Sequence, residues 1–270
     1  MVVMNKVVLC VAVLFFSTQA VVADVSERID HILDSSGFSK LLTRVPDFAQ
    51  AVLRQSSGAL DPEVNSELGA AFAAAFDSER MRSDVIGVVA SHYEQDQAEA
   101  YLQLVQTPLA QQMTVLERVT SDEGQQEAFR GFVTALATHP AAAHRRALVE
   151  QLDNANRASA FSVDMQTAFF RAVFTAIEPV LDEEMGLEPG ELDRMVEEVR
   201  QSLNDATVER TRNAYLFAFK DVDDGQLQAY VELCQAAEYR WMVQLLGNAL
   251  VASINEAGER AALHMIHASR

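Results

Sequence analysis

Cysteine is scarce in this sequence of 270 residues, which contains only Cys10 and Cys234. Cys10 lies within the first 23 residues, where one basic residue, Lys6, is followed by ten apolar residues, Val7 to Phe16. This arrangement predicts a secretory signal peptide over residues 1–23, cleaved near Ala23. The mature chain then keeps a single cysteine, so an intrachain disulfide bond is excluded and packing must stabilise the fold.

Long hydrophobic runs are missing as well. The stretch from Val7 to Phe16 is about half as long as the roughly 20 apolar residues that span a bilayer, and no later stretch approaches that length. We therefore expect no integral membrane segment in the mature chain. The same pattern predicts a periplasmic or secreted location after cleavage of the signal peptide.

Basic residues are outnumbered, with 21 lysines and arginines against 39 aspartates and glutamates, so the formal net charge is −18. Nucleic-acid binding requires a basic face, and docking to anionic lipid head groups requires clustered basic residues. The composition argues against both classes of ligand. A protein partner with a basic surface, or association of the chain with itself, is compatible with this charge.

Glycine and proline are rare, with 11 and 6 residues, and no stretch alternates apolar and polar residues as a β-strand would. Alanine, leucine, glutamate and glutamine are abundant, which is typical of helices. The sequence therefore predicts an all-α fold. We expect an array of about ten helices in two pseudo-repeated halves, each ending in a helical hairpin.

Local signals predict where several helices begin and end. Gly37 suits the left-handed conformation that terminates a helix, and Asp61-Pro62 and Asp77-Ser78 suit helix starts. Thr107-Pro108 should separate two helices, because proline lacks the amide hydrogen that the preceding helix would need. A long apolar helix is expected from Ala158 to Met185, and Asp223 should cap a later one.

The hairpin from Asp223 to Leu250 resembles an upstream segment from Gln95 to Leu116. A shift of 129 positions places Tyr101 on Tyr230 and keeps the helix breaks aligned. We interpret this match as an internal duplication. It divides the chain into a signal peptide (1–23), a first helical half (24–120), a connecting helix and linker (121–140) and a second helical half (141–270).

The junctions inside the two hairpins carry a resemblance to a known family. The first copy has Leu104-Val105, then Thr107-Pro108 and Ala110, and the second has Arg240-Trp241 after the segment Phe217 to Leu233. These features resemble the domain-of-unknown-function 2059 family, a bacterial family of exported all-helical proteins. The resemblance implies an all-helical fold and an exported location, and it implies no catalytic residues.

Motifs for catalysis and metal binding are absent from the sequence. It contains no GxSxG, SxxK, HExxH or Glu-x-x-His pattern and no glycine-rich phosphate loop. His264 and His267 lie three positions apart and would share a helix face, but zinc needs further ligands, and only Glu256 and Glu259 are close in the sequence. We expect no metal, no cofactor and no catalytic residue.

Cys234 falls on one helical stripe with Leu227, Tyr230 and Val231. Its counterpart in the first hairpin is Val105, an ordinary apolar residue. The position therefore predicts a buried small side chain, not a reactive thiol.

Aromatic residues gather in the second half of the chain, and core packing explains most of them. We expect a non-enzymatic protein of the cell envelope that uses its amphipathic hairpins for protein interaction or scaffolding. The alternative is a carrier or sensor of a hydrophobic ligand, held in a cavity between helices of the second half. An enzyme would need a cleft where at least two polar side chains with perturbed pKa values converge. The candidate interaction or ligand surface comprises Tyr230, Tyr239, Arg240, Trp241, Phe170 and Phe174.

Overall fold

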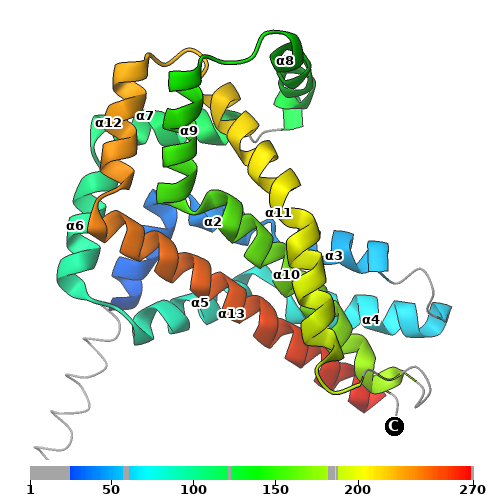
Figure 1. Ribbon diagram of the computed structural model, residues 1–270. Coiled ribbons are helices and arrows are strands. Elements are labelled where there is room, and N and C mark those ends of the chain that lie inside the picture. The colour runs from blue at the N-terminus through cyan, green and yellow to red at the C-terminus, as the bar shows by residue number, and fades with distance from the viewer. Residues whose placement is uncertain (1–24, 57–60, 121–122, 182–185, 187, 269–270) are drawn as a thin grey trace, which may run out of the picture.

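The computed structural model describes residues 25–56, 61–120, 123–181, 186 and 188–268, and every regular element within these ranges is a helix (Figure 1). The expected all-α fold is confirmed: in these ranges twelve α-helices, α2 to α13, follow a helix over residues 25–35. No helix in this part of the chain is long and apolar enough to cross a membrane. The expected signal peptide lies outside the described residues.

Helices of the first half begin at the residues that the local signals predict. The Asp61 carboxylate accepts a hydrogen bond from the amide of Glu63 at the start of α4, and Asp77 caps α5 in the same way. Proline follows each predicted break, at Pro62 and Pro108. The helices are α2 (Phe38–Leu42), α3 (Val45–Ser56), α4 (Pro62–Ala75), α5 (Ser78–Ser91), α6 (Gln95–Val105), α7 (Pro108–Thr120) and, after the 3₁₀ turn η1 (Glu123–Gln125), α8 (Gln126–Thr138).

The expectation of one helix from Ala158 to Met185 was wrong. The helix ends at Ile177, because Pro179 cannot donate the backbone hydrogen bond that would continue it. A short 3₁₀ turn, η2 (Glu178–Val180), follows instead. The helices of the second half are α9 (Ala143–Asn156), α10 (Ala158–Ile177), α11 (Glu191–Ala218), α12 (Asp224–Cys234) and α13 (Ala237–Ala268).

The two hairpins have the same internal layout. Adding 129 to the bounds of α6 gives the bounds of α12, and the same shift carries the first residue of α7 onto the first residue of α13. Asp223 caps α12 as expected, because its carboxylate accepts a hydrogen bond from the amide of Gln226 at 2.9 Å. The second arm differs in length, since α13 has 32 residues and α7 has 13.

Helix α13 runs from the second hairpin along α10 and also contacts α4, α5 and α6 (Figure 1). Small residues allow the crossing with α10 to be close. A Cβ atom added to Gly258 would lie 2.7 Å from the Cα atom of Ala172, which is closer than real Cβ contacts allow. Gly258 is therefore required by the distance between the two helices.

Two apolar cores result, and neither coincides with a half of the sequence. The first core combines the N-terminal helices through Tyr101 with the inner faces of α10 and α13. The second core combines Met113 of α7 with the apolar faces of α9, α11 and α12. Tyr239, near the start of α13, packs against both cores and so lies at their junction.

Candidate functional site

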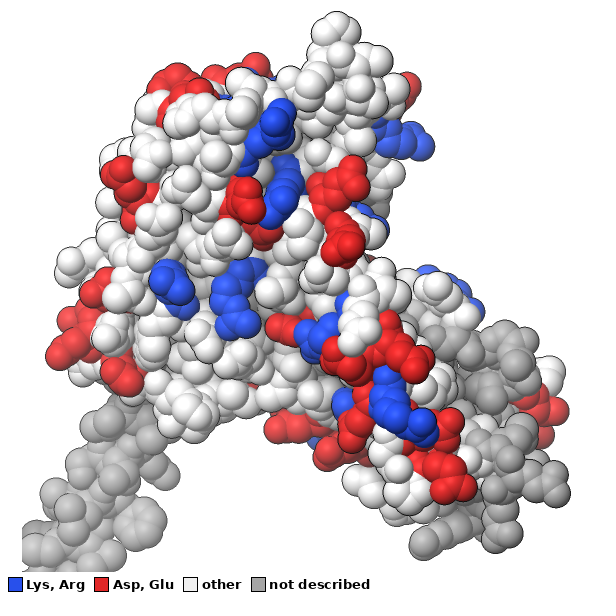
Figure 2. Space-filling model, in the orientation of Figure 1, with Lys and Arg blue, Asp and Glu red and all other residues white. Residues whose placement is uncertain are grey.

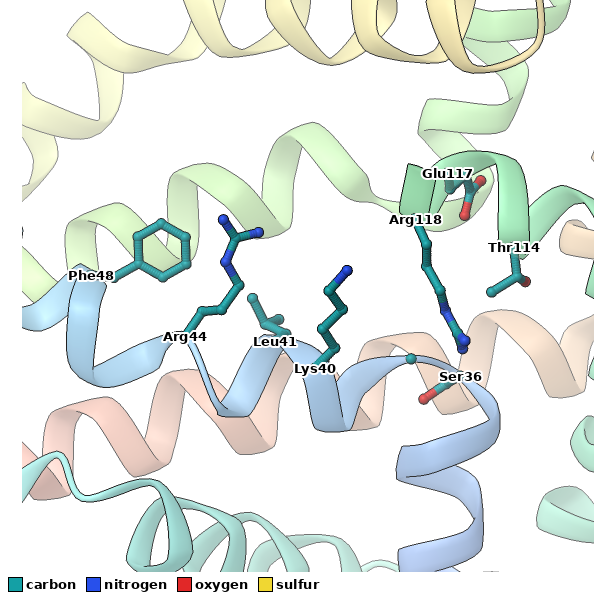
Figure 3. Close-up of a pocket in the computed structure, with 9 residues that line it drawn as sticks. Ser36, Lys40, Leu41, Arg44, Phe48, Thr114, Glu117 and Arg118 are labelled. Atoms are coloured by element: carbon teal, nitrogen blue, oxygen red, sulfur yellow. The ribbon is translucent and has the colours of Figure 1, made fainter. Parts of the chain in front are cut away.

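A cavity of about 260 Å³ lies between the segment that carries α2 and the start of α3, on one side, and α7 on the other (Figure 3). It brings together residues that are more than 60 positions apart in the sequence. We call it the cationic pocket. Its lining consists of Ser36, Gly37, Lys40, Leu41, Arg44, Phe48, Thr114, Glu117 and Arg118.

The turn at Gly37 shapes one end of the cationic pocket. Gly37 has a φ angle of 78°, the left-handed conformation that the sequence predicts there, and α2 begins at the next residue. A Cβ atom at Gly37 would lie 3.2 Å from Nε and Nη2 of Arg118. Glycine is thus needed both for the backbone turn and for the close approach of the Arg118 guanidinium.

Three cationic side chains line the cationic pocket. Lys40 and Arg44 extend from the α2 side, Arg44 near Phe48, and Arg118 extends from α7 toward Ser36 (Figure 3). Acidic groups are spread over the surface of this chain, which carries a formal net charge of −18 (Figure 2). A cavity lined by three positive charges has a positive electrostatic potential, although the chain as a whole is negative. This potential favours an anionic ligand.

Apolar surface lies beside these charges. Leu41 is half-buried, and Phe48 is exposed over 37 % of its surface. The guanidinium carbon of Arg44 lies 6.0 Å from the centre of the Phe48 ring, near the limit of a cation–π contact. The cationic pocket therefore offers a positive region and an apolar region to the same ligand.

Glu117 is the acidic group of the cationic pocket. The hydroxyl of Tyr230 donates a long hydrogen bond, 3.4 Å, to Oε1 of Glu117. Burial raises the pKa of Glu117 to about 7, although the hydrogen bond from Tyr230 and the charge of Arg118 act in the opposite direction. The carboxyl group therefore takes up and releases its proton near neutral pH.

Three tyrosines, Tyr215, Tyr230 and Tyr239, interact electrostatically with Glu117. Burial, with the charge of Glu117 as a further cause, raises the pKa of Tyr215, Tyr230 and Tyr239 well above the ordinary value. Asn156 Nδ2 donates a hydrogen bond to the hydroxyl of Tyr215 at 3.0 Å. These hydroxyl groups keep their protons at neutral pH, so they can donate hydrogen bonds but cannot act as bases.

An enzyme would require at least two polar side chains with perturbed pKa values that converge in one cleft. Glu117 is brought to a pKa at which a carboxyl can act as a base. The tyrosines beside it have pKa values that move away from neutrality. The lining of the cationic pocket thus combines one carboxyl group of raised pKa with three basic side chains.

Cys234 is buried and unpaired, as its place on the apolar stripe predicts. Leu227, Tyr230 and Val231 of the same stripe are also buried. Burial raises the pKa of the Cys234 thiol to about 12, although side-chain hydrogen bonds with Tyr239 and Tyr230 oppose this. The thiol therefore stays protonated, which makes it a poor nucleophile.

The six residues of the candidate surface do not lie in one place. Tyr230 is buried in the second core and faces Glu117. Tyr239 is half-buried between the two cores, with its ring centre 5.7 Å from that of Tyr101. Two of the six thus belong to the surroundings of the cationic pocket.

The other four are spread over α10 and α13. Trp241 is half-buried against the first core. Arg240 is exposed and lines a different cavity, beside α9. Phe170 and Phe174 are half-buried on α10 and pair with each other, with ring centres 4.6 Å apart. The structure does not join these four side chains into one groove.

The two C-terminal histidines, His264 and His267, are exposed on α13. No group of three or more histidine, cysteine, aspartate or glutamate side chains in the described ranges could hold a metal ion.

Sequence reasoning did not find the cationic pocket. Lys40 and Arg44 look like ordinary surface residues in the sequence, and they meet Arg118 and Glu117 only after folding. The one signal in the sequence that could have pointed to these residues is the charge balance. Because basic residues are few in this acidic chain, each of them is a candidate for binding an anion. Their position relative to α7 depends on the turn at Gly37 and on the packing of the first helices.

Comparisons of this chain with models of protein families, with curated proteins and with solved structures found no match. The resemblance to the domain-of-unknown-function family therefore stays a prediction.

Proposed function

We propose that this protein binds a small amphipathic anion in the cationic pocket and serves as its carrier or sensor without changing it chemically. The observation that carries the proposal is the lining of this cavity. Lys40, Arg44 and Arg118 surround it in a strongly acidic chain, and Leu41 and Phe48 add apolar surface beside them. A singly charged head group with a short apolar body matches both regions.

This proposal develops the hydrophobic-ligand alternative and moves its site. The sequence places the cavity among helices of the second half, whereas the cationic pocket is lined by α2, the start of α3 and α7. The anionic head group is the new element, because three cations give the ligand a preferred charge. We also propose an exported location, on the pattern of residues 1–23; N-terminal sequencing of protein from the envelope would test it.

The distribution of exposed apolar residues gives less support to a scaffolding function. A helix–helix interface needs a contiguous apolar patch. The large hydrophobic residues exposed among the described ones lie on three different helices: Phe48 on α3, Val115 and Val119 on α7, and Leu263 on α13. A protein-interaction or scaffolding role therefore ranks second.

Isothermal titration calorimetry with three probes of equal chain length tests the proposal. Octanoate and octyl phosphate carry the anionic head, and octanol has the same apolar body without charge. We expect both anions to bind the wild type more tightly than octanol. The double variant Lys40→Gln with Arg44→Gln should weaken anion binding about tenfold or more, since each charge-assisted contact contributes on the order of 1.5–3 kcal/mol.

A matched control distinguishes the effect of the residues that line the cationic pocket from the effect of the net charge of the protein. Arg54 on α3 and Arg80 on α5 are exposed and do not line the cavity. The double variant Arg54→Gln with Arg80→Gln makes the same change in charge and should leave anion binding within about twofold, because salt screens charges that lie away from the cavity. The proposal fails if the wild type binds neither anion, or if both double variants lose the same affinity.

A further inference from the structure

A second cavity, of about 150 Å³, shares only Ser36 with the cationic pocket. We call it the aromatic cavity. No residue that lines it carries a charge at neutral pH, so its ligand preference differs from that of the cationic pocket. Its lining includes Phe38, Tyr101, Phe161, Tyr239 and Asn156, and α13 adds Val243, Leu246 and Gly247.

Two aromatic pairs form much of its wall. The ring centres of Phe38 and Phe161 are 6.3 Å apart, and those of Tyr101 and Tyr239 are 5.7 Å apart. Each pair joins a residue of the first half to a residue of the second half. Aromatic walls favour a flat apolar guest, because rings pack edge to face or in offset stacks.

One residue that lines this cavity, Asn156, carries a polar atom without a partner. Its Oδ1 is buried and makes no hydrogen bond, while Nδ2 of the same side chain donates to Tyr215. A buried acceptor that stays unpaired is unfavourable. A bound molecule that brings an N–H or O–H group to this atom would satisfy it, which makes Asn156 the point of specific recognition beside the apolar surface.

The backbone holds Asn156 in this position. Asn156 is the last residue of α9, and Arg157 after it has a φ angle of 51°, a left-handed conformation that a side chain disfavours. Of the described residues outside glycine, Arg157 is the one with positive φ. Strained residues of this kind concentrate at binding sites, and here the strain lies directly beside the unpaired acceptor.

A glycine keeps part of the wall open. Gly247 lies inside α13, where glycine is less favourable than alanine. A Cβ atom at this position would come within 3.2 Å of Cδ2 of Phe161. The missing side chain therefore preserves space for the Phe161 ring and for the cavity next to it.

We propose that the aromatic cavity binds one neutral aromatic ring that bears a hydrogen-bond donor, of the phenol or indole class. The ring lies among Phe38, Phe161 and Leu246, and its donor reaches Oδ1 of Asn156. The size is suitable, since an apolar cavity of about 150 Å³ in another protein holds one benzene molecule. This site goes beyond the anion site and does not depend on it.

Phenol and toluene make a matched pair of probes, because they have nearly the same shape and only phenol donates a hydrogen bond. Titration followed by ligand-observed NMR should show that the wild type binds phenol about tenfold more tightly than toluene, the equivalent of one satisfied hydrogen bond. Val243→Phe fills the cavity and should abolish binding of both probes. Asn156→Leu removes the acceptor and should bring phenol down to the affinity of toluene.

A measurement on the wild type covers the case in which a variant fails to fold. Nuclear Overhauser contacts between bound phenol and the methyl groups of Leu246 and Val243 are expected if the ring occupies the cavity. The anion site is separable, because Lys40→Gln with Arg44→Gln should leave phenol binding unchanged. The inference is overturned if the wild type binds neither probe, if those methyl contacts are absent, or if Asn156→Leu keeps the preference for phenol.

Discussion

Tyr230 of α12 donates its hydroxyl hydrogen to Oε1 of Glu117 on α7 over 3.4 Å, although the two residues are 113 positions apart. This hydrogen bond joins the second hairpin to the first. In the shared register Tyr230 corresponds to Tyr101, which lies instead against Tyr239 and is linked to Ser36. Equivalent tyrosines of the two hairpins therefore face different partners, and Tyr230 is the one of the pair that bonds to Glu117.

Glu117 should make stability fall as pH rises toward neutrality. In the unfolded chain its carboxyl loses the proton near the ordinary pKa of about 4.5, whereas the folded protein holds the proton up to about pH 7. Between these values the folded state binds more protons, so raising the pH costs stability. Replacing Glu117 by glutamine removes this cost, and we expect the variant to be more stable than the wild type by about 2 kcal/mol near pH 8.

Urea unfolding of the wild type and of Glu117→Gln at several pH values measures this difference. The two proteins should have nearly equal stability near pH 4, where both side chains are neutral, and should diverge as the pH rises. A difference that is the same at every pH would show that the carboxyl of Glu117 does not titrate in this range.

The affinity of the cationic pocket for an anion should depend on whether the Glu117 carboxyl group carries its proton. Ionised Glu117 adds a negative charge to a pocket that is also lined by Lys40, Arg44 and Arg118. We expect the affinity for octanoate to fall about threefold or more as the pH rises from about 6 to about 8. Calorimetry on Glu117→Gln supplies the control, because its affinity should stay flat over that range, and an equal decline in the variant would rule out Glu117 as the cause.

Gly258→Ala should destabilise the fold. The added methyl group would lie 2.7 Å from Cα and 2.8 Å from Cβ of Ala172, so α10 and α13 must move apart. We expect a loss of about 1–3 kcal/mol in the free energy of unfolding. Gly87→Ala is the matched control, because Gly87 lies in α5 with nothing within 4 Å of an added Cβ, and alanine there should stabilise the helix by about 0.5–1 kcal/mol. The measurement is the midpoint temperature of thermal unfolding, Tm. A Tm that changes in the same direction in both variants would contradict the close crossing of α10 and α13.

Cys234 should be unreactive in the folded protein. Its thiol is buried, and its pKa is raised to about 12. In a chain that starts at Asp24 it is the only cysteine. A thiol reagent such as DTNB should therefore label native protein very slowly and label one thiol promptly in urea. Rapid labelling without denaturant would show that the second core opens readily.

Most helix boundaries could be predicted because their signals are local. Asp61, Asp77 and Asp223 cap the helices that follow them, and Pro108 separates α6 from α7. Each signal acts within a few residues of the boundary, so the sequence contains it directly. The long apolar run after Ala158 misled the prediction, since continuous apolarity concealed the stop at Pro179.

The candidate site could not be predicted because it is assembled by tertiary contacts. Lys40 and Glu117 belong to separate helices that meet only through the packing of the first half. Tyr230 was singled out for its aromatic character, and its role beside Glu117 became visible only from the distance between them. Aromatic bulk in the sequence singled out Tyr230 and Tyr239, but it did not distinguish buried hydroxyl groups from an exposed surface.

The length of α13 has a consequence for how this chain can be divided. Because α10 and α13 complete the first core, a fragment that ends at the linker after α8 would expose the apolar faces of its helices to water. The complementary fragment would carry α13 without the helices it packs against. We expect neither fragment to fold alone and the two to restore the native circular dichroism spectrum when mixed. The two halves of the sequence are then interlocked parts of one cooperative unit, which unfolds and refolds as a whole.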